Sequence, residues 1–332
     1  MCRGSREAFA AGKVGDDVRD AGDREPKGGA RVKALVIGGA GFIGRHLIPL
    51  LREAEYEILA VDPSFTHTRI LPKSVHIEFA GKFERWSISD WCPTNEFDVV
   101  IHLGANIAPI DERSKGGIQH YQDLALDLTV AQWVAKHPPK KCFIYPSSCA
   151  VDAPDDPYGW VKATGEKLCH ALAKEGVLVV ILRPFSGYGH DQADTYPFPA
   201  ILKRVLRGDD PVVVWGSGNQ VRDWIHIDDL ARAFIWAIDR APHAVPIEIG
   251  RGIGCRLALL AETMIEAAGS FSKLVFDSAK PESTYKRVAN VELARLNGFY
   301  PEISLKEGIR RSIAALQPKL NKIGVAGVSL NR

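Results

Sequence analysis

Short apolar runs alternate with amphipathic segments along most of the chain, beginning at residue 32. Apolar runs bounded by polar or turn residues are typical of buried strands, and apolar residues spaced three and four apart indicate helices. The predicted strands span 32–37, 57–61, 75–79, 97–102, 141–146 and 177–182, and the predicted helices span 42–54, 119–136 and 157–175. Such an alternation predicts a parallel sheet with helices on both faces.

The rhythm of the pattern changes after Pro184. A stretch rich in proline and aromatic residues leads into further elements: a predicted helix near 199–207, a strand at 211–215, and an amphipathic helix at 226–240 preceded by a strand. We therefore expect two regions and a tail: a first domain at 32–184 with 224–240 packing back on it, a smaller mixed α/β region at 185–315, and a loose tail at 316–332.

Residues 1–31 are rich in Gly, Ala, Asp and Arg and have no apolar period. A segment of this composition cannot bury enough apolar surface to order itself, so we expect a disordered N-terminal extension. Our hypothesis is that the natural start lies near Val32.

Composition adds few constraints. The 332 residues are 46% hydrophobic and 25% charged with a net charge of +2, which is ordinary for a globular protein and favours neither nucleic-acid nor membrane binding. No apolar stretch approaches the length of a membrane span, and no signal peptide is predicted. The six cysteines form no Cys-x-x-Cys pair. They indicate reduced thiols in a cytoplasmic protein and no metal site.

A glycine-rich turn follows the first predicted strand and opens the first predicted helix. Gly38, Gly41 and Gly44 are spaced as G-x-x-G-x-x-G. The first allows a tight turn, the second lets the backbone approach a pyrophosphate, and the third lets helix and strand pack closely. The helix N-terminus would bind the phosphates. Asp62, about 20 residues further on, would accept hydrogen bonds from the ribose hydroxyls and repel a 2′-phosphate, which indicates NAD rather than NADP.

Tyr158 and Lys162 stand four residues apart on a predicted helix and follow Ser147 and Ser148. Residues at this spacing share one helix face. An ammonium beside a phenol favours the phenolate, so this tyrosine could move protons near neutral pH.

Several motifs then occur in the order typical of one family. The Gly38 turn reads G-x-x-G-F-I-G, residues 98–105 read D-V-V-I-H-L-G-A, and Tyr158 and Lys162 form Tyr-x-x-x-Lys. Residues 183–189 read R-P-F-S-G-Y-G and 222–229 read R-D-W-I-H-I-D-D. Over about residues 32–310 the chain resembles the extended short-chain dehydrogenase/reductases, and among them the NAD-dependent epimerase/dehydratase group that acts on nucleotide sugars. The resemblance implies a Rossmann-type doubly wound parallel sheet with a smaller mixed α/β C-terminal substrate-binding region.

The resemblance also implies roles for individual residues. Tyr158 would be the catalytic acid/base, Lys162 would bind the nicotinamide ribose, and Ser148 would bind the reacting oxygen, with Ser147 as the alternative. The implied NAD-binding residues are Gly38, Gly41, Phe42, Ile43, Gly44, Asp62, Leu103, Gly104, Ala105, Tyr158, Lys162 and Pro184. The implied substrate-binding residues are Ser148, Ser186, Arg222 and Arg287, with both guanidinium groups on the diphosphate of a nucleotide sugar. Members of the family are often homodimers through two helices, and 119–136 and 157–175 could serve.

The residues after the serine narrow the reaction. Dehydratases of the family have Asp-Glu after the catalytic hydroxyl, and decarboxylases have a Glu two positions after it, whereas Cys149 and Ala150 stand here. The pattern favours epimerisation, and we expect it at C4 of the sugar through a transient 4-keto intermediate. There are three alternatives. The protein could be a reductase of a keto-sugar nucleotide, an enzyme whose substrate is a steroid or flavonoid ketone, or a non-catalytic NAD sensor or scaffold. Cys149 could itself be an acid/base or a packing residue.

Some positions depart from the family pattern. Ser148 and Tyr158 are only ten residues apart, but Asp156 can cap the catalytic helix and Pro157 suits its first turn. Lys82 stands where an Asp commonly contacts adenine, and the usual Asn in the helix before Trp133 is not evident. His226, Asp228 and Asp229 suggest the start of a helix, with an Asp as its cap, rather than a metal site.

Overall fold

A computed structural model describes residues 31–62, 75–79, 96–105, 117–153, 156–280, 282 and 285–322, with the backbone alone for 75–79 and 319–322. The predicted extension, apart from Arg31, the position of Lys82 and residues 323–332 lie outside the described residues. Within the described residues no helix is both long and apolar enough to cross a membrane.

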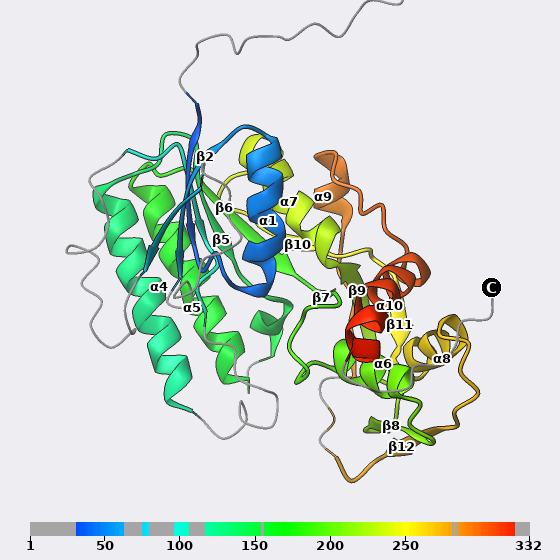
Figure 1. Cartoon of the computed structure of the whole chain (residues 1–332). Helices are drawn as coiled ribbons and strands as arrows, with labels where there is room; N and C mark the ends of the chain where they lie inside the picture. The colour runs from blue at the N-terminus through cyan, green and yellow to red at the C-terminus, as the bar shows by residue number, and fades with distance from the viewer. Residues whose placement is uncertain are drawn as a thin grey trace, which may run out of the picture. The chain divides into compact units, whose positions relative to one another are not determined.

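In the described part of the chain, seven parallel strands form the large sheet, in the order β10-β6-β5-β4-β1-β2-β3 (Figure 1). The order reverses between β1 and β4, so this is the doubly wound arrangement predicted from the sequence. The strands are β1 Lys33–Ile37, β2 Glu57–Asp62, β3 Val75–Phe79, β4 Val99–His102, β5 Cys142–Pro146, β6 Val179–Pro184 and β10 Pro246–Ile249.

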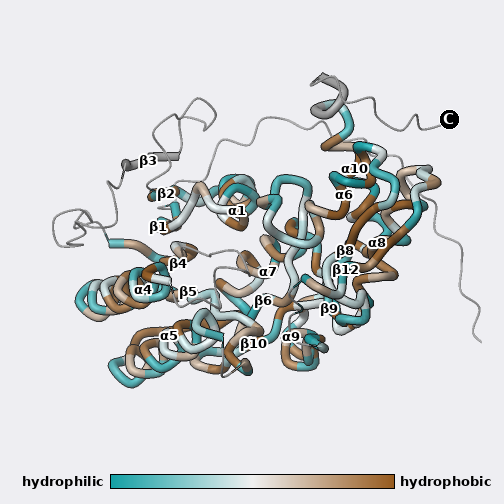
Figure 2. Tube along the Cα trace, turned by 90° about the horizontal axis from the view of Figure 1, so that it is seen from below, coloured by the Kyte–Doolittle hydropathy of each residue, from teal (hydrophilic) through white to brown (hydrophobic). Residues whose placement is uncertain are grey.

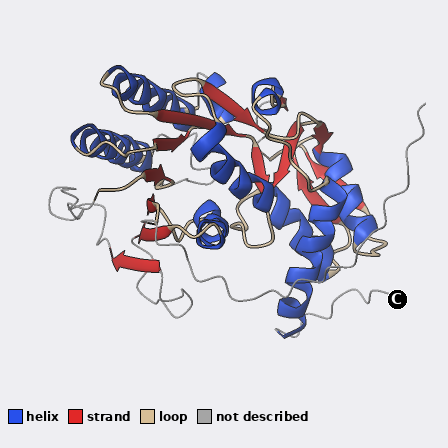
Figure 3. Cartoon of the chain, turned by 90° about the horizontal axis from the view of Figure 1, so that it is seen from above, coloured by secondary structure: helices blue, strands red, loops and turns tan. Residues whose placement is uncertain are grey.

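Helices cover both faces of this sheet, as Figures 1 and 3 show. Side chains alternate along each strand, so Ala34 and Val36 pack on one side and Leu35 and Ile37 on the other. The first side is covered by α1 (Phe42–Glu53) and α7 (Ile227–Arg240), and the second by α4 (Ile118–Lys136) and α5 (Pro157–Lys174). The buried strands therefore read as continuous apolar runs.

A second set of elements follows Pro184. β9 (Val221–His226) pairs with β7 (Ser186–Tyr188), β11 (Gly254–Arg256) and β13 (Lys286–Arg287). β8 (Val212–Trp215) pairs with β12 (Leu274–Asp277). A separate apolar core joins α6 (Pro197–Arg207), α8 (Leu257–Ala267) and α10 (Leu305–Lys322), and Figure 2 shows how hydrophobic α8 is. The short helix α9 (Glu292–Leu296) packs beside β10.

Three details differ from the sequence-based expectations. Helix α6 begins at Pro197, because proline suits the first helical turn. β10, predicted within the C-terminal region, extends the large sheet beside β6. The predicted loose tail is wrong for residues 316–322, which continue α10, and Leu316 is buried against the second core.

Candidate active site

The turn between β1 and α1 requires glycine at two of the predicted positions. Gly38 has φ +83°, and a Cβ there would lie 2.6 Å from the backbone nitrogen of Gly104. A Cβ on Gly44 would lie 2.4 Å from the carbonyl oxygen of Gly39. The positive φ of Gly38 fits the predicted tight turn, and the two glycines let the turn pack against the residues that follow β4 and let α1 pack against the turn.

The N-terminus of α1 lies at the carboxyl edge of the sheet. Its cap residue is Gly41, which has no side chain to accept from the first backbone N–H groups. Asp62 ends β2, and its Oδ2 accepts a hydrogen bond from Ala40 N at 3.1 Å, which places this carboxylate beside the turn. An anion-binding helix end beside a strand-end carboxylate fits a dinucleotide.

Other predicted cofactor residues end neighbouring strands at this edge. Leu103 follows β4 and donates its N–H to Ile37 O at 2.7 Å, and Gly104 and Ala105 come next. Pro184 ends β6. The carboxyl ends of parallel strands around the point where strand order reverses form the binding crevice of such sheets. The structure thus brings the predicted residues of β1, β2 and β4 to one edge.

Tyr158 and Lys162 lie on the first two turns of α5. The side chain of Asp156 accepts from Tyr158 N at 3.1 Å and Pro157 takes the first position, so the predicted cap is confirmed. Both functional side chains are buried, with Tyr158 9% and Lys162 3% exposed. The Lys162 Nζ lies 6.0 Å from the centre of the Tyr158 ring.

The two serines after β5 differ in their surroundings. Ser147 is buried and donates its hydroxyl to Glu166, which also receives two hydrogen bonds of 2.7 Å from Arg183. Ser148 is half-buried, and its Oγ accepts from Ala150 N at 3.1 Å. The Ser147 hydroxyl is thus committed to Glu166. This difference favours Ser148 as the serine facing a substrate, although its role stays a prediction.

A close contact brings Ser148 toward α5 despite the short connection. Ser148 caps the 3₁₀ helix Cys149–Asp152, and a Cβ on Gly159 would lie 2.2 Å from the carbonyl oxygen of Ala150 in it. Because Gly159 has no side chain, the start of α5 packs directly on this turn.

Arg222 and Arg287 are partners in the parallel ladder of β9 and β13. Residues paired in register project to the same face of a sheet, about 5 Å apart. Burial, and then the charge of Arg287, lowers the pKa of Arg222 to about 10. Arg287 also lies 4.0 Å from the Asp156 carboxylate. Ser186 begins β7, which also pairs with β9, and its partner there is Trp224. Two clustered guanidinium groups suit a ligand with two negative charges.

Cys149 lies near this arginine pair. It packs against Phe185, Ala289 and Val291. Burial raises the pKa of its thiol, while Arg287, a hydrogen bond with Ser148, and Arg222 act in the opposite direction. The apolar contacts fit a packing residue, and the nearby positive charges fit an acid/base.

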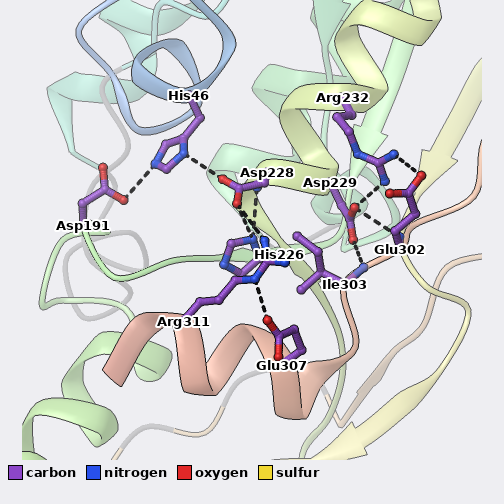
Figure 4. A network of polar contacts seen from close by, with 10 residues as sticks. All are labelled: His46, Asp191, His226, Asp228, Asp229, Arg232, Glu302, Ile303, Glu307 and Arg311. Atoms are coloured by element: carbon purple, nitrogen blue, oxygen red, sulfur yellow. Dashed lines mark hydrogen bonds and ion pairs between the residues drawn. The ribbon is translucent and has the colours of Figure 1, made fainter. Parts of the chain in front are cut away.

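His226, Asp228 and Asp229 organise the start of α7, as Figure 4 shows. The cap is the His226 ring, whose Nδ1 accepts from Asp228 N at 3.2 Å, so the expectation of an aspartate cap is wrong. Asp229 accepts from Ile303 N at 2.8 Å. Within the described residues no group of three His, Cys, Asp or Glu side chains is arranged to hold a metal ion.

Sequence reasoning missed a buried polar cluster beneath Lys162. His102 Nε2 lies 2.9 Å from Asp127 Oδ1, and the Tyr145 hydroxyl donates to Asp127 Oδ2 at 2.6 Å. Lys162 Nζ lies 4.7 Å from the centre of the Tyr145 ring. A signal was present, because Asp127 interrupts the apolar face of its helix and His102 ends an apolar strand.

A doubly wound parallel sheet with this turn and this Tyr–Lys pair defines an extended short-chain dehydrogenase/reductase. Residues 34–250 match the model of the NAD dependent epimerase/dehydratase family. The chain belongs to that family of enzymes, and its cofactor is NAD.

Individual relatives are similar over different lengths. GDP-L-fucose synthase of Escherichia coli (strain K12) is 32% identical over an alignment of 173 residues that covers 47% of this chain and 54% of that protein. The chain thus spans about half the length of this relative. An uncharacterized UDP-glucose epimerase of Bacillus subtilis (strain 168) is 28% identical over 86% of this chain and 98% of its own. The crystal structure of UDP-glucose 4-epimerase with UDP-glucose from Thermotoga maritima has the same fold, with a TM-score of 0.78 and 23% identity over 87% of this chain and 100% of that one.

Proposed function

We propose that the chain is an NAD-dependent nucleotide-sugar epimerase that inverts C4 through a transient 4-keto sugar. The observation that carries the proposal is the combination of the buried Tyr158–Lys162 pair with the Arg222–Arg287 pair. The first suits proton transfer beside a dinucleotide, and the second suits a diphosphate. Relatives named for UDP-glucose support a substrate of this class.

The chain's own residues would divide the work as follows. Tyr158 takes the proton from the sugar 4-hydroxyl and later returns one to the same oxygen, Ser148 holds that oxygen, and the Lys162 charge favours the phenolate. Arg222 and Arg287 hold the diphosphate, with Ser186 beside them. NAD, held by the Gly38 turn and Asp62, would supply the reversible hydride transfer. Positioning by these groups supplies much of the catalysis.

The absence of a carboxylate after the serine supports epimerisation over loss of water or carbon dioxide. Cys149 and Ala150 occupy those two positions, and Ala150 is buried in the 3₁₀ turn. Neither residue can supply a second carboxyl proton. The Ser148, Tyr158 and Lys162 set is sufficient for oxidation and reduction at one carbon.

Reduction of a keto-sugar nucleotide is the second candidate. It is favoured by the 32% identity to GDP-L-fucose synthase and by Cys149 beside two guanidinium groups. The two candidates differ in stoichiometry, because a reductase consumes reduced cofactor and an epimerase does not. A non-catalytic NAD sensor remains a third prediction from the sequence, and the Tyr158→Phe variant described below separates it from both enzymes.

The decisive experiment incubates the purified protein with UDP-, GDP- and dTDP-sugars, with and without added NAD or NADPH, and follows the sugar signals by NMR. Conversion between two 4-epimers without net cofactor consumption is expected. Consumption of one equivalent of NADPH per product would favour the reductase. Absence of binding and turnover with all three nucleotide classes would contradict the proposal.

We also propose a homodimer through α4 and α5, in a cytoplasmic protein. Exposed apolar side chains lie along one stripe of α4: Ile118, Tyr121 and Leu128. The ring of Trp160 on α5 packs edge-on against the Tyr121 ring, with 6.5 Å between the ring centres. Light scattering is expected to give twice the chain mass, and Tyr121→Glu to give the monomer. A monomeric wild type would contradict this assembly.

A further inference from the structure

The buried cluster beneath Lys162 holds a carboxylate in one orientation. Asp127 is 4% exposed and accepts one hydrogen bond at each oxygen, from His102 Nε2 and from the Tyr145 hydroxyl. These donors come from β4 and β5, so the carboxylate of α4 is fixed by the sheet beneath it. Burial raises the pKa of Asp127, but the Lys162 charge and the two hydrogen bonds outweigh it, so the pKa lies below its usual value.

Tyr145 connects this carboxylate to Lys162. Its hydroxyl donates to Asp127, and its ring face lies 4.7 Å from Lys162 Nζ, within the range of a cation–π contact. The geometry depends on Gly165 of α5, where a Cβ would lie 1.9 Å from the Tyr145 hydroxyl oxygen. A helix-interior glycine is unfavourable by itself, so its presence here is explained by the passage of the phenol beneath α5.

The ammonium group has little contact with solvent. Lys162 is 3% exposed, and a buried ammonium loses its proton readily unless an anion compensates for the lost hydration. The groups that act on it are Asp127 and Asp123 of α4, and Tyr158 and Cys169 of its own helix; the Tyr145 ring of β5 lies beneath it. Asp127 has the largest favourable effect of these, and the pKa of Lys162 lies above its usual value despite burial.

We propose that Asp127 and Tyr145 are positioning residues for Lys162, with the carboxylate as its buried counterion and the ring as the platform for its ammonium. His102 fixes the second oxygen of the carboxylate and so completes the arrangement. The proposal rests on the roles of Tyr158 and Lys162 proposed above. It adds that the protonation and position of the Lys162 ammonium are controlled by Asp127 and Tyr145, which we propose do not touch substrate.

The first test measures Lys162 itself in the NAD-loaded protein. Lysine labelled with ¹³C at Cε is followed by NMR from pH 6 upward, with the Lys162 signal assigned from its loss in Lys162→Arg. In Asp127→Asn, Lys162 is expected to release its proton at a lower pH than in the wild type. An unchanged titration would overturn the proposal. This readout needs no substrate, so it stands even if the proposed reaction is wrong.

The second test uses the pH dependence of kcat/KM once a substrate is found. If Asp127 keeps Lys162 charged, Lys162 becomes neutral in Asp127→Asn and no longer favours the Tyr158 phenolate. The acid limb of the pH profile, which reports Tyr158, then moves to higher pH, and kcat/KM near neutral pH falls by about tenfold or more. If Lys162 keeps its charge without Asp127, the loss of the Asp127 carboxylate makes the Tyr158 phenolate more favourable. The acid limb then moves to lower pH, and this result would refute the proposal. The opposite signs make the two readings separable.

Two further variants guard against a structural explanation. Tyr145→Phe keeps the ring and removes only the hydroxyl, so a smaller shift in the same direction is expected, and it replaces Asp127→Asn if that variant does not fold. The matched control is Asp239→Asn, which removes an exposed carboxylate of α7 that pairs with Lys141. It should shift neither the NMR titration of Lys162 nor the pH profile of kcat/KM. An equal shift in Asp239→Asn would also overturn the proposal.

Discussion

Arg287 lies directly beside Arg222 in the ladder of β13 and β9, and after burial its charge is the main cause that lowers the pKa of Arg222. Arg287→Gln therefore has two expected effects. Thermal stability of the unliganded protein changes little, because loss of the like-charge contact with Arg222 offsets loss of the 4.0 Å contact with the Asp156 carboxylate. Affinity for a nucleoside diphosphate falls by about 10- to 100-fold, because a charge-assisted hydrogen bond is lost.

Calorimetric titration with UDP and GDP measures the affinity, and a melting curve without ligand measures the stability. Arg256→Gln, an exposed arginine at the end of neighbouring β11, is the control and should change neither. Unchanged diphosphate affinity in Arg287→Gln would remove Arg287 from the binding site.

Tyr158→Phe tests the acid/base assignment. The variant lacks only the phenolic hydroxyl, so turnover is expected to fall by about 100- to 10,000-fold. NAD should still bind within about threefold of the wild-type affinity, because the glycine turn and Asp62 are untouched. Tyr300→Phe, at an exposed position that follows α9, should leave turnover unchanged. If Tyr158→Phe retained turnover, another group would have to transfer the proton, and Cys149 would be the next candidate.

His46 makes stability depend on pH. Its ring lies 3.1 Å from both Asp191 and Asp228 (Figure 4). Burial alone lowers its pKa, but the two carboxylates outweigh burial and raise the pKa to about 9. A raised pKa in the folded state means that the stabilisation is complete below the unfolded value of about 6.5 and is lost as pH rises toward about 9.

The melting temperature of the wild type is therefore expected to fall between about pH 6.5 and 9 more steeply than that of His46→Gln. Thermal unfolding at half-unit steps of pH checks this. His243→Gln, at an exposed position, should keep the wild-type slope. Parallel curves for wild type and His46→Gln would show that the ion pairs of α1 with Asp191 and Asp228 contribute nothing measurable.

Gly165→Ala reverses the usual rule for helices. Alanine normally stabilises a helix interior by about 1 kcal/mol relative to glycine, but here its Cβ would collide with the Tyr145 phenol. The free energy of unfolding is expected to fall by about 3 kcal/mol, as for an overpacked core. Chemical denaturation measures it, with exposed Lys167→Ala as the control. A stabilised Gly165→Ala would mean that Tyr145 does not lie beneath α5 as described.

Local signals were sufficient where a feature depends on neighbouring residues. The Gly38 turn, the Asp156 cap and the alternation of strands and helices could be predicted, because they depend on backbone freedom, on a hydrogen bond two residues away and on apolar period. The cap of α7 was predicted wrongly, since His226 and two aspartates stand together there and only the folded geometry shows which side chain reaches the free N–H group.

Features that depend on distant segments could not be read from the chain. The tail was misread because residues 316–322 have few apolar side chains and include Pro318, whereas the helix that they end is stabilised by packing against α6 and α8. β10 was assigned to the C-terminal region because a four-residue strand carries no mark of its partner, which is β6.

The sequence by itself determined the class of fold, the cofactor turn and the Tyr158–Lys162 pair, because each depends on patterns among residues that are close along the chain. Only the tertiary structure decided that the Ser147 hydroxyl binds Glu166, that Arg222 lies beside Arg287, and that Asp127 and Tyr145 lie beneath Lys162. These relationships join segments separated by up to 65 residues. Sheet register and helix packing set their geometry, and no local pattern encodes those.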